Sequence, residues 1–302
     1  MCIRDRAWWE LCLYDVQGAA VLGADRSLLA SGRLDNQLSC WAGAQALRAA
    51  SPAGQVAVVV MNDHEEVGSS STTGASGPFL ESVLSRLVAG RGGTVDDRHR
   101  AFAASSCVSA DNAHAVHPNY PERHEPGHQP IVNAGPALKV NSTQRDATSA
   151  TTAAAFQRSC DAADVPWQVF VSRNNMPCGS TIGPLTATRL GIEPVDVGVP
   201  QLSMHSAREL CGAQDPLYLT RAMQAYLTGC PDVAGRAQPA CARASSKRRW
   251  SSTDSSSVAA LTAARCTRRG DVSDAPPSSP ASSTWMGAPM TTHTLRGWII
   301  LA

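Results

Sequence analysis

The length, composition and charge of the chain are those of a globular protein. It has 302 residues, of which 43% are hydrophobic and 17% are charged, and its formal net charge is +1. No apolar run reaches the length that crosses a bilayer, and no signal-like segment opens the chain. We therefore expect a soluble, cytoplasmic protein without a membrane partner.

The predicted elements alternate between helices and strands. After residues 1–7, which we interpret as an assembly scar, the apolar spacing of residues 38–50 predicts a helix and the run Val56–Met61 predicts a buried strand. We expect further helices over residues 79–88, 147–163 and 215–226, and further strands over 101–109, 135–140, 167–171 and 194–204. This order predicts an α/β domain in which helices sandwich a mixed β-sheet.

Residues 231–302 differ from the rest of the chain in composition. They are rich in Ser and Pro, contain no Glu, and hold nine Lys/Arg against four Asp, so they carry +5 and the preceding part −4. The basic residues are not interleaved with aromatic ones, so we expect no nucleic-acid partner. We predict that this tail is disordered or aberrant, either a flexible extension or the product of a shifted reading frame.

Acidic residues and histidines gather in four separate segments, each just past a predicted strand or helix boundary. The candidates are Asp35, the run Asp63-His64-Glu65-Glu66, the group Asp111, His114 and His117, and His205. Loops that follow strands can converge at one edge of a sheet. Carboxylates and histidines there could hold a pair of divalent ions that activate water for peptide hydrolysis. The alternatives are solvated acids at strand ends, a helix N-cap at Asp111, and a structural hydrogen bond for His205.

An extended backbone would give the two glutamates of the doublet Glu65-Glu66 separate roles. Neighbouring side chains of an extended segment point in opposite directions. If the backbone is extended here, one glutamate can bind metal while the other faces the substrate as a base.

Several motifs of the chain occur in the same order as in the aspartyl aminopeptidases. They are Arg33-Leu34-Asp35-Asn36, Asp63-His64-Glu65-Glu66-Val67-Gly68-Ser69, the run from Ser109 to Asn119, Lys139-Val140-Asn141, and Met204-His205-Ser206 with Arg208-Glu209. Long motifs in a fixed order identify a family better than one short pattern does. Over roughly residues 10–229 the chain resembles this family of two-zinc metallo-aminopeptidases. The resemblance implies a phosphorylase/hydrolase-like catalytic domain, in which helices flank a mixed sheet.

The resemblance also implies which residues hold the metal. Asp35 would bridge two Zn²⁺ ions, Glu66 and His205 would complete one zinc site, and Asp111 would serve the other. A cis peptide bond is expected after Asp35.

Further roles implied by the resemblance concern the substrate. Glu65 would be the general base, moving a proton from the attacking water to the leaving amine. Lys139 would contact a peptide with N-terminal Asp or Glu, the alternative being a surface lysine. Residues 176–183 would form an active-site loop, and the protein would be a homo-oligomer.

Two features of the chain depart from the family pattern. It has no histidine before His64, so one zinc position would lack a ligand. Residues 8–30 resemble only the end of the family's dimerisation domain, whereas residues 31–230 match the catalytic core. We therefore expect little or no activity from the chain as written. The open alternatives are a related two-metal peptidase or deacylase of other specificity, and a non-catalytic metal-binding or assembly module.

Overall fold

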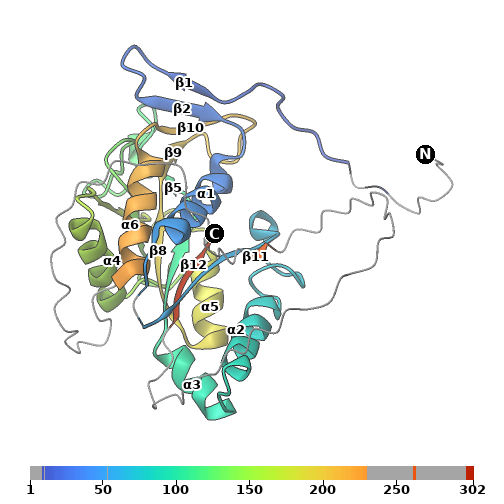
Figure 1. The fold of residues 1–302 in the computed structure, drawn as a ribbon. Coiled ribbons are helices and arrows are strands. Elements are labelled where there is room, and N and C mark those ends of the chain that lie inside the picture. The colour runs from blue at the N-terminus through green and yellow to red at the C-terminus, as the bar shows by residue number, and fades with distance from the viewer. Residues whose placement is uncertain (1–8, 10, 53, 230–260, 263–296) are drawn as a thin grey trace.

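A seven-stranded sheet forms the centre of the molecule (Figure 1). The computed structural model describes residues 9, 11–52, 54–229, 261–262 and 297–302. The strands, in their order across the sheet, are β11 (Leu261–Thr262), β3 (Val56–Met61), β12 (Gly297–Leu301), β4 (Ser106–Ala110), β8 (Glu193–Gly198), β6 (Ala137–Val140) and β7 (Gln168–Val171). The pairs from β11 to β8 are all parallel, whereas β6 runs antiparallel to β8. The sheet is therefore mixed, as predicted.

A smaller five-stranded sheet lies across the end of the larger one at which β3 and β4 finish (Figure 1). Its strands in order are β1 (Ala20–Leu22), β2 (Leu28–Ser31), β10 (Glu209–Gly212), β9 (Pro200–Leu202) and β5 (Ala113–His114). Two of the connections between the sheets are short, because β4 continues into β5 and β8 into β9 almost at once. The loops at this end are therefore held between two sheets.

Helices cover both faces of the large sheet. One face carries α1 (Leu34–Ala49), α4 (Ala150–Ala162) and α6 (Asp215–Gly229), and the other carries α2 (Phe79–Gly90), α3 (Val95–Ala103) and α5 (Ile182–Leu190). Strand alternation builds both cores: Val59 belongs to the first, and Val58 and Val60 belong to the second. This confirms the predicted α/β fold. Within the described ranges, none of these helices combines the length and apolar character that a bilayer crossing requires.

Two predictions of secondary structure were wrong in part. Residues 101–109 were expected to be one strand, but α3 ends at Ala103 and β4 begins at Ser106. The sequence signal for α3 is a capping box, in which the hydroxyl of Thr94 accepts from the Asp97 amide and the Asp97 carboxylate accepts in return. Helix α5 was not predicted, because the small residues before it read as a loop.

The end of the chain differs from the tail that we predicted. Residues 297–301 form the central strand β12, and Ile300 and Leu301 are completely buried. The run Trp298–Leu301 is continuously apolar, which is typical of a strand buried on both faces. Residues 261–262 form the edge strand β11, and residues 231–260 and 263–296 of the predicted tail lie outside the described residues.

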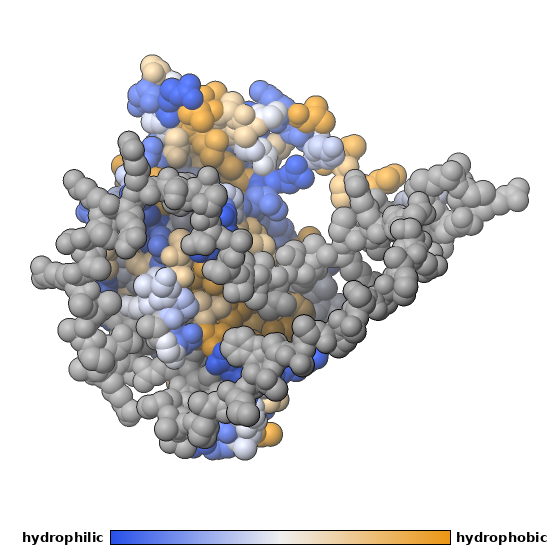
Figure 2. Space-filling view, in the orientation of Figure 1, coloured by the Kyte–Doolittle hydropathy of each residue, from blue (hydrophilic) through white to orange (hydrophobic). Residues whose placement is uncertain are grey.

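Hydrophobic side chains are exposed along the first described residues. Leu11, Leu13 and Val16 are at least 86% exposed, and Val21 and Leu22 in β1 are 44% exposed. Figure 2 shows this as orange surface on the arm that leaves the small sheet. Exposed apolar groups in such a row are typical of a surface that contacts another domain or subunit.

Candidate metal centre

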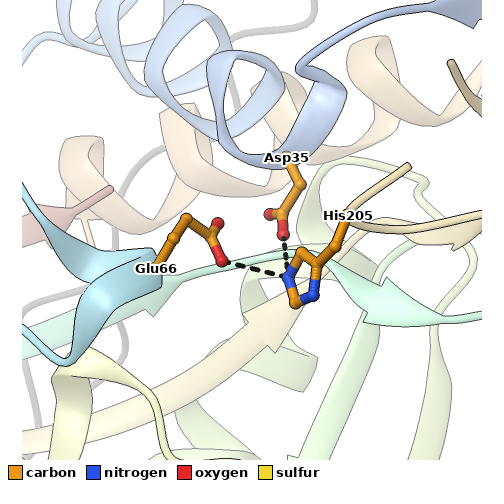
Figure 3. A group of neighbouring side chains, drawn as sticks. All are labelled: Asp35, Glu66 and His205. Atoms are coloured by element: carbon orange, nitrogen blue, oxygen red, sulfur yellow. Dashed lines mark ion pairs between the residues drawn. The ribbon is translucent and has the colours of Figure 1, made fainter. Parts of the chain in front are cut away.

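Three potential ligands converge beside the carboxyl ends of the central strands (Figure 3). Asp35 lies at the start of α1, Glu66 follows β3, and His205 follows β9. The His205 Nε2 atom is 3.2 Å from Asp35 Oδ2 and 3.0 Å from Glu66 Oε2. The structure thus brings together three of the four predicted metal residues, from three segments far apart in the sequence.

Left-handed backbone conformations aim these side chains. Arg33 precedes Asp35 with φ of 58°, His64 precedes Glu65 with φ of 59°, and His205 itself has φ of 63°. Such values are uncommon for residues other than glycine, and they gather at sites where function fixes the backbone. The peptide bond between Asp35 and Asn36 is cis, as the family resemblance led us to expect.

The backbone at Glu65 and Glu66 is not extended, so that interpretation was wrong. These two residues form the 3-10 helix η2 (Glu65–Val67), which ends at Gly68 with φ of 97°. Adjacent side chains on such a turn diverge by about a third of a circle rather than by half. Both glutamates therefore line the same cavity.

Glu209 positions two of the candidate ligands. Its two carboxylate oxygens accept hydrogen bonds from the backbone amides of Asp35 and His205, each at 2.8 Å. Glu209 is only 2% exposed, so water cannot compete for these hydrogen bonds. In the sequence, Glu209 was identified only as the last residue of a motif, with no role predicted for it. Its position four residues after His205 is the sequence feature that could have indicated one.

The fourth predicted metal residue, Asp111, is paired with a lysine. Lys139 Nζ lies 3.2 Å from Asp111 Oδ2, and Lys139 is 6% exposed, which rules out the alternative of a surface lysine. Burial alone would lower the pKa of Lys139, but the nearby carboxylates of Asp111, Asp146 and Asp196 raise it. The lysine is therefore a firmly charged, buried cation.

The two groups line one cavity of about 470 Å³. Burial, followed by the charges of Asp111 and Glu66, raises the pKa of Asp35 to about 8. The same causes in the same order raise the pKa of Glu65 to about 7. The loop over residues 172 and 177–181 closes one side of this cavity, and it includes most of the predicted active-site loop.

Two histidines of the third segment behave differently from each other. His114 faces the cavity, and burial and then the charge of Lys139 lower its pKa, so its imidazole is neutral. The His117 ring instead lies tilted against that of Tyr120, with centroids 5.2 Å apart, and its Nδ1 accepts a hydrogen bond from the Asn119 amide. The described structure therefore gives His117 no place at the cavity.

The three converging residues fit a zinc ion. Their ligand atoms all lie within 4.8 Å of one another, and zinc takes carboxylate oxygens and imidazole nitrogens as ligands. The other oxygen of Asp35, Oδ1, is buried and has no hydrogen-bond partner among the described residues. A buried carboxylate oxygen without a donor is costly unless a cation approaches it.

Comparison with known proteins agrees with this geometry. The family model described as aminopeptidase I zinc metalloprotease (M18) matches residues 3–227. A probable M18 family aminopeptidase 2 of Streptomyces coelicolor is 53% identical over 223 residues, covering 72% of this chain and 52% of the relative. One of Stutzerimonas stutzeri is 53% identical over 218 residues, covering 72% of this chain and 50% of the relative.

Solved structures of similar proteins share the fold. The structure of the Ape4 and Nbr1 complex matches with a TM-score of 0.65 and 36% identity, over 71% of this chain and 42% of that one. The S. cerevisiae mApe1 dodecamer matches with a TM-score of 0.61 and 29% identity, over 70% of this chain and 48% of that one. The chain thus spans about half the length of the relatives it matches. It belongs to the M18 family of aminopeptidase I zinc metalloproteases.

Proposed function

We propose that this cavity is the site of a zinc aminopeptidase that removes N-terminal acidic residues from peptides in the cytoplasm. The observation that carries the proposal is the convergence of Asp35, Glu66 and His205 within ligand distance of one another. These residues would hold a zinc ion, which would supply a bound water of lowered pKa and polarise the scissile carbonyl group. Membership of a zinc metalloprotease family supports this choice of metal.

Glu65 is the proposed general base. It lines the cavity next to Glu66, and its pKa, raised to about 7 mainly by burial, suits proton transfer at neutral pH. Its carboxylate takes the proton of the attacking water and delivers it to the leaving amine when the tetrahedral intermediate collapses.

Asp111 and Lys139 are proposed to set the second metal position and the substrate preference. The carboxylates of Asp35 and Asp111 would be the groups that hold a second zinc ion, and Asp35 Oδ1 is buried without a hydrogen-bond partner among the described residues. A cation at Asp111 would compete with Lys139 for the same oxygen, from which the lysine now lies 3.2 Å. Once released, the ammonium group would be free to pair with an acidic substrate side chain.

The test is hydrolysis of dipeptides with N-terminal Asp, Glu, Leu or Lys by the chain supplied with zinc. We expect slow, zinc-dependent release of Asp and Glu, because one zinc position has few ligands here. Glu65→Gln should abolish release while leaving zinc bound, and Glu122→Gln, a change at an exposed glutamate, should alter neither. Equal rates for all four dipeptides would overturn the acidic preference and favour a related peptidase. Release unaffected by Glu65→Gln would overturn the proposed base.

A non-catalytic metal-binding or assembly role is the second candidate. It is favoured because, among the described residues, Asp35, Glu66 and His205 are the group found within ligand distance, and Asp111 is tied to Lys139. Counting zinc by elemental analysis separates the candidates: two ions per chain support the enzyme, and one supports the module. Homo-oligomer formation is also proposed, since a relative is described as a dodecamer and Leu11 and Leu13 are exposed.

A further inference from the structure

Strand β12 fills a central position of the large sheet although it comes from the last residues of the chain. It lies between β3 and β4 and runs parallel to both (Figure 1). Residues 230–296 separate it from α6, and the family match ends at residue 227. The portion of the chain that matches the family therefore leaves β3 and β4 one strand apart, roughly 10 Å.

Main-chain hydrogen bonds hold the end of β12 against β3. The Ala302 amide donates to the Val60 carbonyl at 3.0 Å, and the Asn62 amide donates to the Ala302 carbonyl at 2.8 Å. The register on the other side pairs Ile299 with Cys107 and Leu301 with Ser109. Without this strand the inner edges of β3 and β4 would lose their partners, and buried amides without partners are costly.

Side chains of β12 also complete both hydrophobic cores. Ile300 is fully buried in the core under α1, where its methyl group would lie 3.4 Å from a Cβ added at Gly43. Ile299 and Leu301, which are 1% and 0% exposed, belong to the core on the opposite face. The space between β3 and β4 thus fits a short strand that carries apolar side chains on both faces. On the face of Ile300, helix α1 lies close to the strand.

We propose that the space between β3 and β4 is an acceptor site for a parallel apolar strand, and that residues 297–302 occupy it within the same chain. Recognition combines main-chain pairing with burial of alternate side chains on opposite faces, the mode by which sheets take up an added strand. Because this segment belongs to the same chain as β3 and β4, its pairing with them is intramolecular. A second copy of the chain, exchanging the same strand, is the competing occupant.

Peptide binding to the full chain tests the acceptor site. The probe is a fluorescein-labelled peptide with the sequence of residues 297–302. In Ile300→Asp the buried charge should expel the chain's own strand, so the peptide should bind this variant at least about tenfold more tightly than the unchanged chain. Ile131→Asp is the matched control, since Ile131 is 53% exposed, and it should behave as the unchanged chain. Equal peptide binding by all three proteins would overturn the proposal.

Hydrogen exchange of the unchanged chain keeps the proposal testable if Ile300→Asp does not fold. The amides of residues 299–302 should exchange at least about 100-fold more slowly than in the free peptide, like those of β4. Exchange at the free-peptide rate would overturn the proposal. Protection that is independent of protein concentration, in a chain that elutes as a monomer, supports occupation within the same chain. Protection that is lost on dilution of a dimer would assign the strand to a second copy.

Discussion

Two buried carboxylates, Asp35 in the cavity and Asp215 at the start of α6, differ in what surrounds them. Asp215 accepts hydrogen bonds from the amides of Asn133 at 2.7 Å and Gly135 at 3.3 Å. Asp35 has an oxygen without any donor among the described residues, and its charged neighbours Asp111 and Glu66 have the same sign. Burial raises the pKa of both groups, to about 8 for Asp35 and about 6 for Asp215.

The surroundings of these two carboxylates distinguish a buried acid with a structural role from one that is suited to bind a cation. Both are withdrawn from water, so burial alone does not distinguish them. Asp215 obtains compensation from backbone amides and fixes the loop of residues 133–135 against α6. Asp35 lacks backbone donors of this kind, and the neighbouring carboxylates of Asp111 and Glu66 repel it, which is an arrangement that a divalent ion would reverse.

Replacing Asp35 should have the largest effect. Asp35→Asn removes a ligand and a repulsive charge, so we expect zinc affinity to fall by more than about 100-fold while the metal-free protein becomes more stable by on the order of 1 kcal/mol. Chelator competition measures the first and urea unfolding the second. Asp161→Asn, at an exposed position, is the control and should change neither. A destabilised variant with normal affinity would assign Asp35 to the same class as Asp215.

Glu209 tests whether the backbone support of the cluster matters. Glu209→Gln keeps the size of the side chain but turns one acceptor into a donor, facing the amide of Asp35 or His205. We expect zinc affinity to fall by about 10–100-fold, the usual effect of losing a group that orients a ligand. Glu122→Gln provides the exposed comparison. Unchanged affinity in calorimetry would show that the ligands hold their positions without it.

Asp215 should give the opposite pattern to Asp35. Asp215→Asn replaces an acceptor that serves two buried amides, so we expect the free energy of unfolding to fall by roughly 3 kcal/mol. Zinc affinity at the Asp35 cluster should stay within about twofold, because the substituted group contacts the loop, α6 and Gly212 of β10 rather than the proposed ligands. Denaturation curves and chelator competition on the same preparation check both statements. A loss of zinc affinity as large as that of Asp35→Asn would erase the distinction.

The pH dependence of stability offers the finest comparison. Because burial raises the folded-state pKa of Asp215 from 3.8 to about 6, the folded state binds the proton more tightly than the unfolded state does. Its contribution is therefore most favourable below about pH 4, decreases as the pH rises to about 6, and is constant above that, with an amplitude on the order of 3 kcal/mol. The difference in unfolding free energy between the unchanged chain and Asp215→Asn, measured from pH 4 to 7 in chelator, should follow this curve. A difference in unfolding free energy that does not change with pH would show that burial does not raise the pKa of Asp215.

The sequence predicted which side chains meet in the cavity better than it predicted their supporting contacts. Asp35, Glu66 and His205 lie close together, as expected from the motifs that contain them, and their role as metal ligands stays a proposal. Glu209 was missed as a positioning group because its role depends on two backbone amides that only the fold brings together. The doublet Glu65-Glu66 was expected to be extended, since periodicity cannot reveal a left-handed residue such as His64 just before it.

The fold class was predictable, but individual elements were less so. The continuous apolar run of Val56–Met61 predicted a buried strand, and the alternation of helices and strands predicted the mixed sheet. β12 carries a similar run but was hidden by the Ser- and Pro-rich composition of the residues before it. Its partners β3 and β4 are more than 180 residues away in the chain, and no local pattern contains that pairing.

The position of Ala302 decides where the protein can be extended for purification. Leu301 is paired with Val60 and with Ser109, so a residue added after Ala302 would leave the sheet between Asn62 and Asp111, at the metal cavity. A carboxyl-terminal oligohistidine tag would thus deliver competing imidazoles to the ligands themselves. A zinc count made on a protein tagged after Ala302 would report the tag as well as the site.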